Sequence, residues 1–559
     1  MSTSLKHPIN AEESNSNSPS RTASLKSKGD FLESHGASTP QEDRDGPLAQ
    51  TPADDLGFES ALPDSRRTIG IVSATFLIIN RCIGTGIFAT PSSILKATGS
   101  VGLSLICWAI GALIAAAGLA VYIEWGTGVP ISGGEKAYLS FLERAYRAPR
   151  WSALCAYAAY SVLLGWPAGN ALVFGQYILK AADSAPTEWK AKGIGAAVLT
   201  FCLLIWGLRL QNLLGTFKVF ILLFIACSGF AALAGHTRLP EQPNNFHNAF
   251  EGTTADAYGI VTALYNVIWS FIGFSNVNYS LSEVKNPRRT LSLAAPLAMA
   301  TITLLYILVN IAYVFTYFAA VPKSDILNSQ TTIAAVFFEN MFGTSAQRAL
   351  SVIVALSALG NVLSVLFAQG RIVQSLGWDG VLPVSKAFGS NWPLGAPFAG
   401  LATHWLVSMI ILIAPPFGDT YNFILNLVSY PLNIVNLVIS VGLLSLYFHT
   451  PPGLSRPWSP SFRAGWPVVA FFGVASAFLV IAPYVPPSKG NSVYEHLPYY
   501  LHCVVGAGIF VAGAVYWAIW FRVLPRLGHY QIQPRKETLQ DGTIITVLDR
   551  VPLSPPSSA

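Results

Sequence analysis

The chain has 559 residues, of which 52% are hydrophobic and only 11% are charged, and its mean hydropathy is +0.47. Soluble globular domains carry about 25% charged residues, so this composition excludes an ordinary soluble protein and indicates a polytopic membrane protein. The net charge of +6 hides an acidic N-terminal segment: residues 1–67 hold 11 acidic and 7 basic residues, and the basic remainder suits loops facing anionic lipid better than nucleic acid.

Both ends of the chain differ in composition from its centre. Residues 1–66 are rich in Ser, Pro, Asp and Glu and have no apolar core, which predicts a disordered tail and no signal peptide. Three lysines in this tail (Lys6, Lys26 and Lys28) are candidate sites for ubiquitin attachment, so ubiquitin-ligase adaptors are possible partners there. Residues 526–559, ending in "VPLSPPSSA", are predicted to form a second disordered tail.

Twelve apolar segments lie between the tails, and together they predict an all-α permease domain over residues 67–525. A spanning helix needs about 20 apolar residues. The predicted spans, in chain order, are 69–96, 101–125, 151–180, 193–208, 212–234, 257–281, 291–319, 347–370, 396–416, 421–447, 464–484 and 497–521. The first, third and sixth are interrupted or polar, and the fourth is short.

The distribution of basic residues predicts the orientation of the twelve spans. An even number of spans places both tails on one side, and the loops of that side carry twelve lysines and arginines against seven in the opposite loops. Cytoplasmic loops are enriched in these residues. The sequence therefore predicts that both termini are cytoplasmic, most simply at the plasma membrane.

The first span contains a predicted break. "IGTGIF" (Ile83–Phe88) places two glycines one residue apart in the middle of an apolar run. A broken helix in lipid leaves backbone groups unpaired at several kcal/mol each, which is tolerated only where the backbone lines a cavity or meets a ligand. The second half-helix, starting near Thr85, would offer its free N–H groups to an anion such as a carboxylate.

A second interruption occurs five spans later. The sixth span reads "YNVIWSFIGFSNVNYSLSEVKNPRRTL", in which Gly273 is flanked by Ser270, Ser275 and two asparagines. Paired interruptions in corresponding helices are typical of inverted-repeat transporters with a binding site at the membrane midplane. Spans 1–5 and 6–10 would then form a 5+5 inverted repeat with broken helices 1 and 6, followed by two additional spans.

Three motifs resemble those of a known superfamily. "GTGIFATP", "GGEKAYL" (Gly133–Leu139) and "SEVKNPRRTL" (Ser282–Leu291) are similar to motifs of the amino acid–polyamine–organocation superfamily, in its L-type amino acid transporter branch. "INRCIGTGIFATPSSIL" and "GWPAGNALVFGQYIL" resemble most closely the fungal high-affinity methionine permeases. The resemblance covers about residues 68–525. It implies a secondary active transporter, not an enzyme, that imports a neutral L-amino acid, with methionine as the expected substrate.

The resemblance also implies a set of substrate-binding residues. The α-carboxylate would meet backbone N–H groups of the first break, and the α-amino group would meet carbonyls near Cys82 and Ile83 and at Trp269. Trp269 stands where the family usually has a gating phenylalanine. Other residues of the sixth span would shape the side-chain pocket. The complete predicted set is Cys82, Ile83, Gly84, Thr85, Gly86, Ile87, Trp269, Phe271, Gly273, Phe274 and Ser275.

Lys218 is the one charge in the fifth span, "NLLGTFKVFILLFIACSGF". One interpretation is a lysine whose long stem lets its ammonium reach the interface. The resemblance favours another, because the family has a lysine at this position beside the first break, where sodium-driven relatives bind sodium. Lys218 is therefore the predicted proton-coupling residue of a proton symporter. Arg81, in the first span, is predicted to lie near the cytoplasmic mouth, with substrate contact as the less favoured alternative.

No cofactor or metal is expected, because the sequence has no metal-type Cys/His cluster and all six cysteines lie in apolar stretches. The loop at 181–193 lacks the cysteine that bonds a heavy chain in metazoan relatives, so no disulfide-linked partner is implied. The expected partners are the amino acid, protons and the bilayer.

Two other classes of membrane protein lack support in the sequence. A major-facilitator transporter would need a basic motif after span 2 and a long central loop, and the sequence has neither. A membrane-embedded enzyme would need a catalytic cluster that the sequence also lacks. Two alternatives remain open: a transporter-like amino acid sensor, and an amino acid exchanger without proton coupling.

Overall fold

The fold was obtained as a computed structural model. It describes residues 55–58, 67–185, 187–204, 208–239, 248–254, 256–329, 331–392, 395–487, 492–539 and 542–553. The predicted N-terminal tail therefore lies outside the described residues except for 55–58. That short segment is ordered against α6 (Glu135–Ala145): Arg144 donates to the Leu56 carbonyl at 3.2 Å, and its guanidinium lies 4.2 Å from the ring centre of Phe58. The prediction of a disordered tail is wrong for these four residues.

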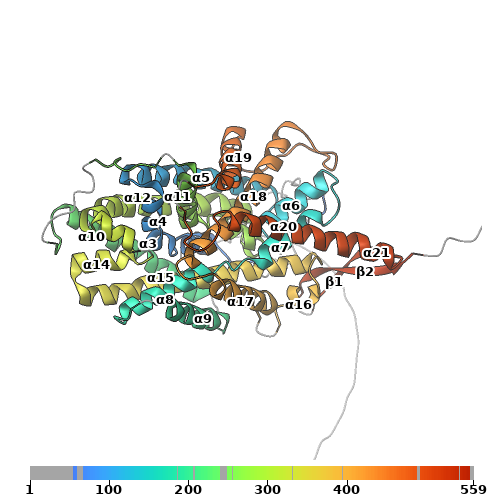
Figure 1. Cartoon of the computed structure of the whole chain (residues 1–559). Helices are drawn as coiled ribbons and strands as arrows, with labels where there is room; N and C mark the ends of the chain where they lie inside the picture. Colours follow the sequence, from blue (N-terminus) through green and yellow to red (C-terminus); the bar gives the residue numbers. More distant parts are fainter. Residues whose placement is uncertain are drawn as a thin grey trace, which may run out of the picture. The chain divides into compact units, whose positions relative to one another are not determined.

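The first five predicted spans correspond to the elements from α2 to α10 (Figure 1). The first span is divided into three helical pieces and the third into two, and α6 lies between the second and third spans. In chain order the elements are α2 (Ile71–Cys82), α3 (Gly86–Ala89), α4 (Pro91–Thr98), α5 (Val101–Gly128), α6, α7 (Ser152–Leu163), α8 (Ala168–Ala181), α9 (Glu188–Leu204) and α10 (Leu208–Leu233).

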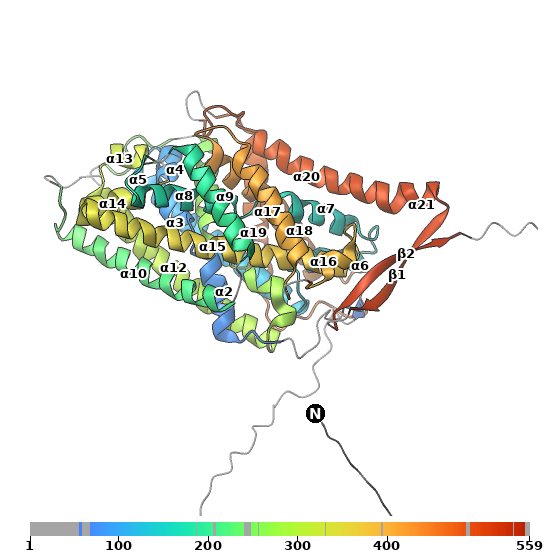
Figure 2. The same cartoon turned by 90° about the horizontal axis from the view of Figure 1, so that it is seen from below.

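The second repeat begins with the broken sixth span. Two short helices, α13 and α14, precede the eighth span and connect it with the seventh. The elements are α11 (Ala257–Phe271), the 3-10 helix η2 (Asn276–Glu283), α12 (Pro287–Ala320), α13 (Lys323–Asn328), α14 (Ile333–Phe342), α15 (Thr344–Trp378), α16 (Ser385–Gly389), α17 (Phe398–Ile413) and α18 (Thr420–Phe448). Helices α10 and α12 pack side by side (Figure 2).

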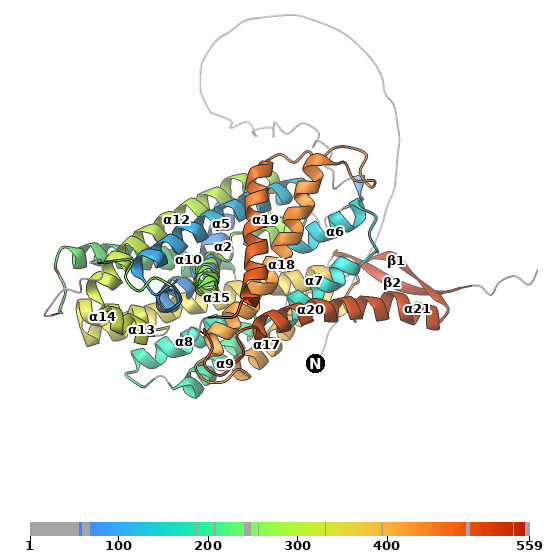
Figure 3. The ribbon, with the colours of Figure 1, turned by 45° about the horizontal axis from the view of Figure 1, so that its top comes forward.

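Two further spans follow the repeats. Helix α19 packs against α18, whereas α20 packs along α7, and a hairpin ends the described chain (Figure 3). The elements are α19 (Trp466–Ile481), η3 (Ala482–Tyr484), α20 (Leu501–Ala518), η4 (Ile519–Val523), α21 (Leu524–Leu527), β1 (Tyr530–Thr538) and β2 (Ile544–Pro552).

Among the described residues, ten helical segments are long and apolar enough to cross a membrane. The two remaining predicted spans correspond to α9 and α17, which have 17 and 16 residues and lie near the lower limit of length for a span. The predicted all-α polytopic fold, with the first and sixth spans broken, is confirmed.

The C-terminal hairpin contradicts the prediction of a second disordered tail over residues 526–559. Strands β1 and β2 pair antiparallel from Tyr530–Pro552 to Thr538–Ile544. Ile545 is fully buried and packs with Trp378 at the end of α15. Lys386 of α16 forms an ion pair with Glu537 at 2.7 Å. The hairpin is therefore anchored on the bundle by one apolar contact and by charges, and we call this end of the bundle the hairpin end.

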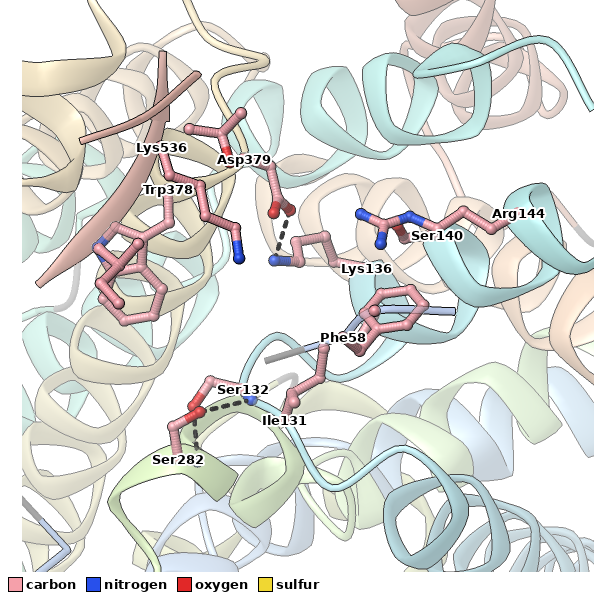
Figure 4. Close-up of a pocket in the computed structure, with 14 residues that line it drawn as sticks. Phe58, Ile131, Ser132, Lys136, Ser140, Arg144, Ser282, Trp378, Asp379 and Lys536 are labelled. Carbon is pink, nitrogen blue, oxygen red and sulfur yellow. Dashed lines mark hydrogen bonds and ion pairs between the residues drawn. The ribbon is translucent and has the colours of Figure 1, made fainter. Parts of the chain in front are cut away.

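The hairpin borders a basic pocket at this end (Figure 4). Lys136 of α6 pairs with Asp379 at 2.7 Å, and Ser132 and Ser282 exchange backbone-to-hydroxyl hydrogen bonds at 2.9 and 3.1 Å. The latter bonds tie the loop before α6 to the end of the sixth span. At the opposite end, which we call the α14 end, Asp419 accepts backbone N–H groups from the segment before α20.

Candidate functional site

The first span is broken at the predicted glycines. Helix α2 ends at Cys82, and α3 begins at Gly86 after three non-helical residues. No acceptor among the described residues is assigned to the backbone N–H groups of Gly84, Gly86 or Ile87. The first N–H groups of any helix lack an intrahelical partner, and they carry the positive end of its dipole. Gly86 and Ile87 therefore offer available donors at the start of α3, and the Gly84 N–H lies just before them in the break, which suits a carboxylate.

Asn170 of α8 holds the centre of this break. The Thr85 hydroxyl donates to Asn170 Oδ1 at 2.7 Å, and the Thr85 N–H donates to the same oxygen at 3.4 Å. Thr85 is thereby fixed from the third span, while the N–H groups on either side of it stay available. The signal for Asn170 was present in "GWPAGNALVF", but nothing in a single sequence indicates which span faces the break.

The Asn80 and Arg81 carbonyls near the end of α2 are bound by side chains from two other helices. Lys218 Nζ of α10 donates to the Asn80 carbonyl at 2.8 Å. Asn361 Nδ2 of α15 donates to the Arg81 carbonyl at 2.6 Å. Because the C-terminal carbonyls of a helix carry its negative dipole end, a cation and an amide are favourable partners there. These contacts keep the end of α2 in place without a covalent continuation into α3.

The sixth span is broken at Gly273, between α11 and η2. Gly273 has a φ of +129°, and a Cβ there would lie 2.4 Å from Arg81 Cγ, so only glycine fits both the backbone and the space. Ser275 follows directly, and its hydroxyl lies 3.1 Å from the Tyr279 hydroxyl. The interruption predicted from the sequence is thus a tight backbone crossing against α2.

The two broken spans cross in opposite directions. The second half of the first span packs on the first half of the sixth, since a Cβ on Gly86 would lie 2.7 Å from Ser270 Cα. The first half of the first span packs on the second half of the sixth, where Asn276 Nδ2 donates to the Leu77 carbonyl at 3.1 Å. This is the antiparallel relation that an inverted repeat requires.

Tyr306 of α12 connects both breaks. Its hydroxyl lies 2.8 Å from the Cys82 carbonyl and 2.8 Å from the Ser270 carbonyl. Cys82 Sγ additionally donates to the Phe271 carbonyl at 3.4 Å. The Cys82 carbonyl, predicted to meet an α-amino group, therefore already accepts one protein donor, whereas the Ile83 carbonyl has none assigned among the described residues.

The predicted pocket side chains lie in three different places. Trp269 and Ile83 are buried at the break. The Trp269 ring packs against Gly169 of α8, where an added Cβ would lie 3.6 Å from the ring. Phe274 and Ser275 line a cavity on the hairpin side of Gly273. The ring of Phe271 instead lies against Tyr306 and Trp108, with ring centres 5.0 and 6.3 Å apart, so it supports the break from behind.

Two cavities approach the break from opposite ends. The hairpin-end cavity is lined by Arg81, Tyr122, Gly273, Phe274, Ser275 and Tyr279, among others. The α14-end cavity includes Ser92, Gln176, Thr331 and Tyr421. Tyr421 of α18 lies beside Thr85 and Trp269, and the break residues between the two cavities are buried. The first break is therefore buried between the two cavities in this conformation.

Lys218 lies where the sequence predicted, beside the first break. Its side chain is 1% exposed. It packs closely on Gly360 of α15, where an added Cβ would lie only 3.1 Å from Lys218 Cε. Its ammonium therefore does not reach an interface, and the snorkelling interpretation is wrong. Arg81 is also buried and lines the hairpin-end cavity.

Sequence reasoning missed four residues that hold the site together: Asn170, Tyr306, Asn361 and Tyr421. Each is an isolated polar residue in an apolar span, and such residues in lipid are usually oriented toward the bundle interior. That rule identifies them as candidates, but it cannot assign them to the breaks, because their partners lie on other spans.

Comparisons with known proteins show the family of the chain. The profile of the family described as amino acid permease matches residues 69–510. The high-affinity methionine permease of Saccharomyces cerevisiae is 50% identical over 492 residues, covering 87% of this chain and 84% of that protein.

More distant relatives cover nearly the same region. The low-affinity methionine permease of S. cerevisiae is 29% identical over 493 residues, covering 86% of this chain and 87% of that protein. The human b(0,+)-type amino acid transporter 1 is 28% identical over 467 residues, covering 81% of this chain and 88% of that protein. The chain therefore belongs to the amino acid permease family.

Proposed function

We propose that this permease imports L-methionine, with the substrate carboxylate held by the N–H groups of Gly84, Gly86 and Ile87. The observation that carries the proposal is the broken first span, whose three N–H groups have no acceptor assigned within the described chain. The half-identical relative named as a high-affinity methionine permease supports the choice of substrate.

The surroundings of the break favour a neutral side chain. Trp269, Ile83 and Phe274 supply apolar surface, and no carboxylate lines the described part of the hairpin-end cavity. The one charge in that cavity is Arg81. A methionine thioether is unbranched and adapts to an irregular apolar space. Trp269 and Tyr421, between the break and the α14-end cavity, would then form the outer gate.

Uptake is proposed to be coupled to protons through Lys218. Its ammonium donates to the Asn80 carbonyl in the last turn of α2, directly before the break. A buried charge of this kind costs on the order of 2.5–3.5 kcal/mol on insertion scales, so a functional role is the expected reason for keeping it. Loss or gain of its proton would change how firmly α2 is held.

The hairpin end is proposed to face the cytoplasm, with both tails on that side, at the plasma membrane. The basic residues of α6, α15 and α16 at this end follow the positive-inside rule.

Competition for uptake tests the proposal. The protein is expressed in cells that lack their own methionine permeases, and uptake of radiolabelled methionine is measured against each of the twenty amino acids. Methionine should compete best, leucine weakly, and arginine and glutamate not at all. Competition by arginine or glutamate without competition by methionine would overturn the substrate assignment. Binding of methionine without any uptake would support a sensor.

A further inference from the structure

A buried carboxylate lies beyond the substrate site, at the hairpin end. Glu135, the first residue of α6, is 1% exposed. It accepts hydrogen bonds from three phenol hydroxyls: Tyr122 of α5 at 2.6 Å, Tyr279 of η2 at 2.9 Å and Tyr157 of α7 at 3.0 Å. The carboxylate thus ties the second half of the broken sixth span to three other helices.

The charges around Glu135 leave it without a cationic partner in the described chain. Two neighbouring cations on the hairpin end are paired elsewhere, Lys136 with Asp379 and Arg371 with Glu283 at 3.1 Å. A third, Arg81, is buried and lines the cavity beside Tyr122 and Tyr279, and it forms no ion pair with Glu135 among the described residues. Tyr138 and Tyr160 are the other titratable groups close to it, and both are neutral phenols at physiological pH. Burial of a carboxylate without a cationic partner costs free energy, so a functional role is the expected reason for keeping Glu135 there.

Two of the three tyrosines have a second acceptor within reach. The Tyr122 hydroxyl lies 2.9 Å from Asn436 Oδ1, and the Tyr279 hydroxyl lies 3.1 Å from Ser275 Oγ. If Glu135 takes up a proton, these phenols can turn to Asn436 and Ser275 without leaving a buried donor unpaired. The network therefore accommodates both the ionised and the neutral carboxyl, and the neutral form strengthens the contact with Ser275 at the break.

Burial and hydrogen bonding act on Glu135 in opposite directions. Burial raises the pKa of the Glu135 carboxyl, and the hydrogen bonds from Tyr122, Tyr279, Tyr157 and its own backbone lower it, with burial dominant. Opening of the hairpin end would replace burial with water and return the pKa toward its ordinary value. By linkage, the closed end holds the proton more firmly and the open end releases it.

We propose that Glu135 is a proton-binding site of the transport cycle, which takes up a proton while the hairpin end is closed and releases it when that end opens. The inference rests on the proposed proton-coupled function and assigns the releasing group. The cavity that connects the break to Tyr122 and Tyr279 provides the route from the substrate site. The proton leaves to cytoplasmic water, and the ionised carboxylate then re-forms its three phenol bonds as the end closes.

The test uses the full-length protein in liposomes with an internal pH of about 7.5 and an external pH of about 5.5. Accumulation of labelled methionine and acidification of the lumen, read by an entrapped pH dye, are measured together. Methionine counterflow at a uniform pH of about 7.5 reports transport without a proton gradient. The variant is Glu135→Gln, which keeps the size of the side chain and cannot ionise.

The matched control is Glu143→Gln, on the same helix. Glu143 is also a buried carboxylate, but it accepts backbone N–H groups of Trp151 and Ala153 instead of the tyrosines. We expect E135Q to keep counterflow within about twofold of wild type while its pH-driven accumulation ratio falls to about 1. E143Q should retain both activities and the lumen acidification.

Each other outcome overturns part of the account. Accumulation and acidification at wild-type levels in E135Q would overturn the inference alone. Loss of counterflow together with accumulation in E135Q would make Glu135 a structural member of the gate and would also overturn it. If the wild-type protein accumulates methionine without regard to the pH gradient, the proton coupling in the proposed function fails first, and this inference fails with it.

Discussion

Tyr306 provides a direct test of how the two breaks are held together. Tyr306→Phe removes one hydroxyl and keeps the ring that packs against Phe271 and Trp108. The carbonyls of Cys82 and Ser270, both 2.8 Å from that hydroxyl, would lose this donor inside the bundle. A buried polar group left without its partner costs about 1–3 kcal/mol.

The expected loss of methionine affinity depends on which conformational state bears this cost. If it falls on the closed, substrate-bound state, a loss of 1–3 kcal/mol corresponds to a methionine affinity lower by about 5-fold to 150-fold, since each 1.4 kcal/mol is tenfold. We expect Y306F to weaken methionine binding to the purified protein by about tenfold, measured by isothermal titration calorimetry.

The matched control for Y306F is Tyr138→Phe. Tyr138 is also fully buried, and its hydroxyl has no hydrogen-bond partner in the described part of the chain. Y138F should bind methionine as wild type does. The reasoning is refuted if Y306F binds as tightly as Y138F, or if both variants lose affinity equally, since the loss would then reflect general packing of tyrosines.

The remaining predictions address the first break, the buried lysine and the N-terminal tail. Gly86→Val should abolish uptake and also lower the melting temperature, because its side chain would collide with the backbone of Ser270; a variant that transports normally would contradict this packing. Lys218→Met should remove the pH and uncoupler sensitivity of methionine accumulation between about pH 5 and pH 7.5, and unchanged sensitivity would exclude Lys218 as the coupling residue. Deletion of residues 1–55 should preserve the initial uptake rate and slow substrate-induced removal from the cell surface, whereas a truncated protein that reaches the membrane without transporting would argue for a direct role of the tail.

The structure changes the reason for which Gly86 must be small. The resemblance implied that the substrate carboxylate meets the backbone N–H groups of the first break, Gly86 included. The Cβ position of Gly86 faces Ser270, so packing alone already requires glycine there. The available N–H group of Gly86 remains consistent with carboxylate binding. Loss of transport in G86V therefore cannot by itself locate the substrate.

The breaks themselves were predictable because lipid makes backbone interruptions rare. Gly84 and Gly86 in the first span, and Gly273 among polar residues in the sixth, stand out from apolar sequence without any alignment. The partners of the breaks were not predictable in the same way. Tyr306 and Asn361 lie on spans that a hydropathy reading places in order but not in space.

For the C-terminal hairpin, a signal that was present in the sequence was given too little weight. Its composition is polar and contains several prolines, which suggested disorder. The signal for structure was the Asp-Gly pair at 541–542, a favoured hairpin turn, directly before a run of β-branched residues at 543–547. Ile545 then supplies the apolar contact with Trp378 that anchors the hairpin on the bundle. The prediction of disorder relied on the polar composition, whereas the Asp-Gly turn signal indicated the hairpin correctly.

A structure of the protein with bound L-methionine would show where the substrate carboxylate is held. We expect the carboxylate oxygens to lie within about 3.2 Å of the backbone nitrogens of Gly84, Gly86 and Ile87, as in ordinary N–H···O bonds. The thioether should lie toward Trp269 and Phe274. A carboxylate bound to the Arg81 guanidinium in the hairpin-end cavity, with the N–H groups of the first break left uncontacted, would contradict the account.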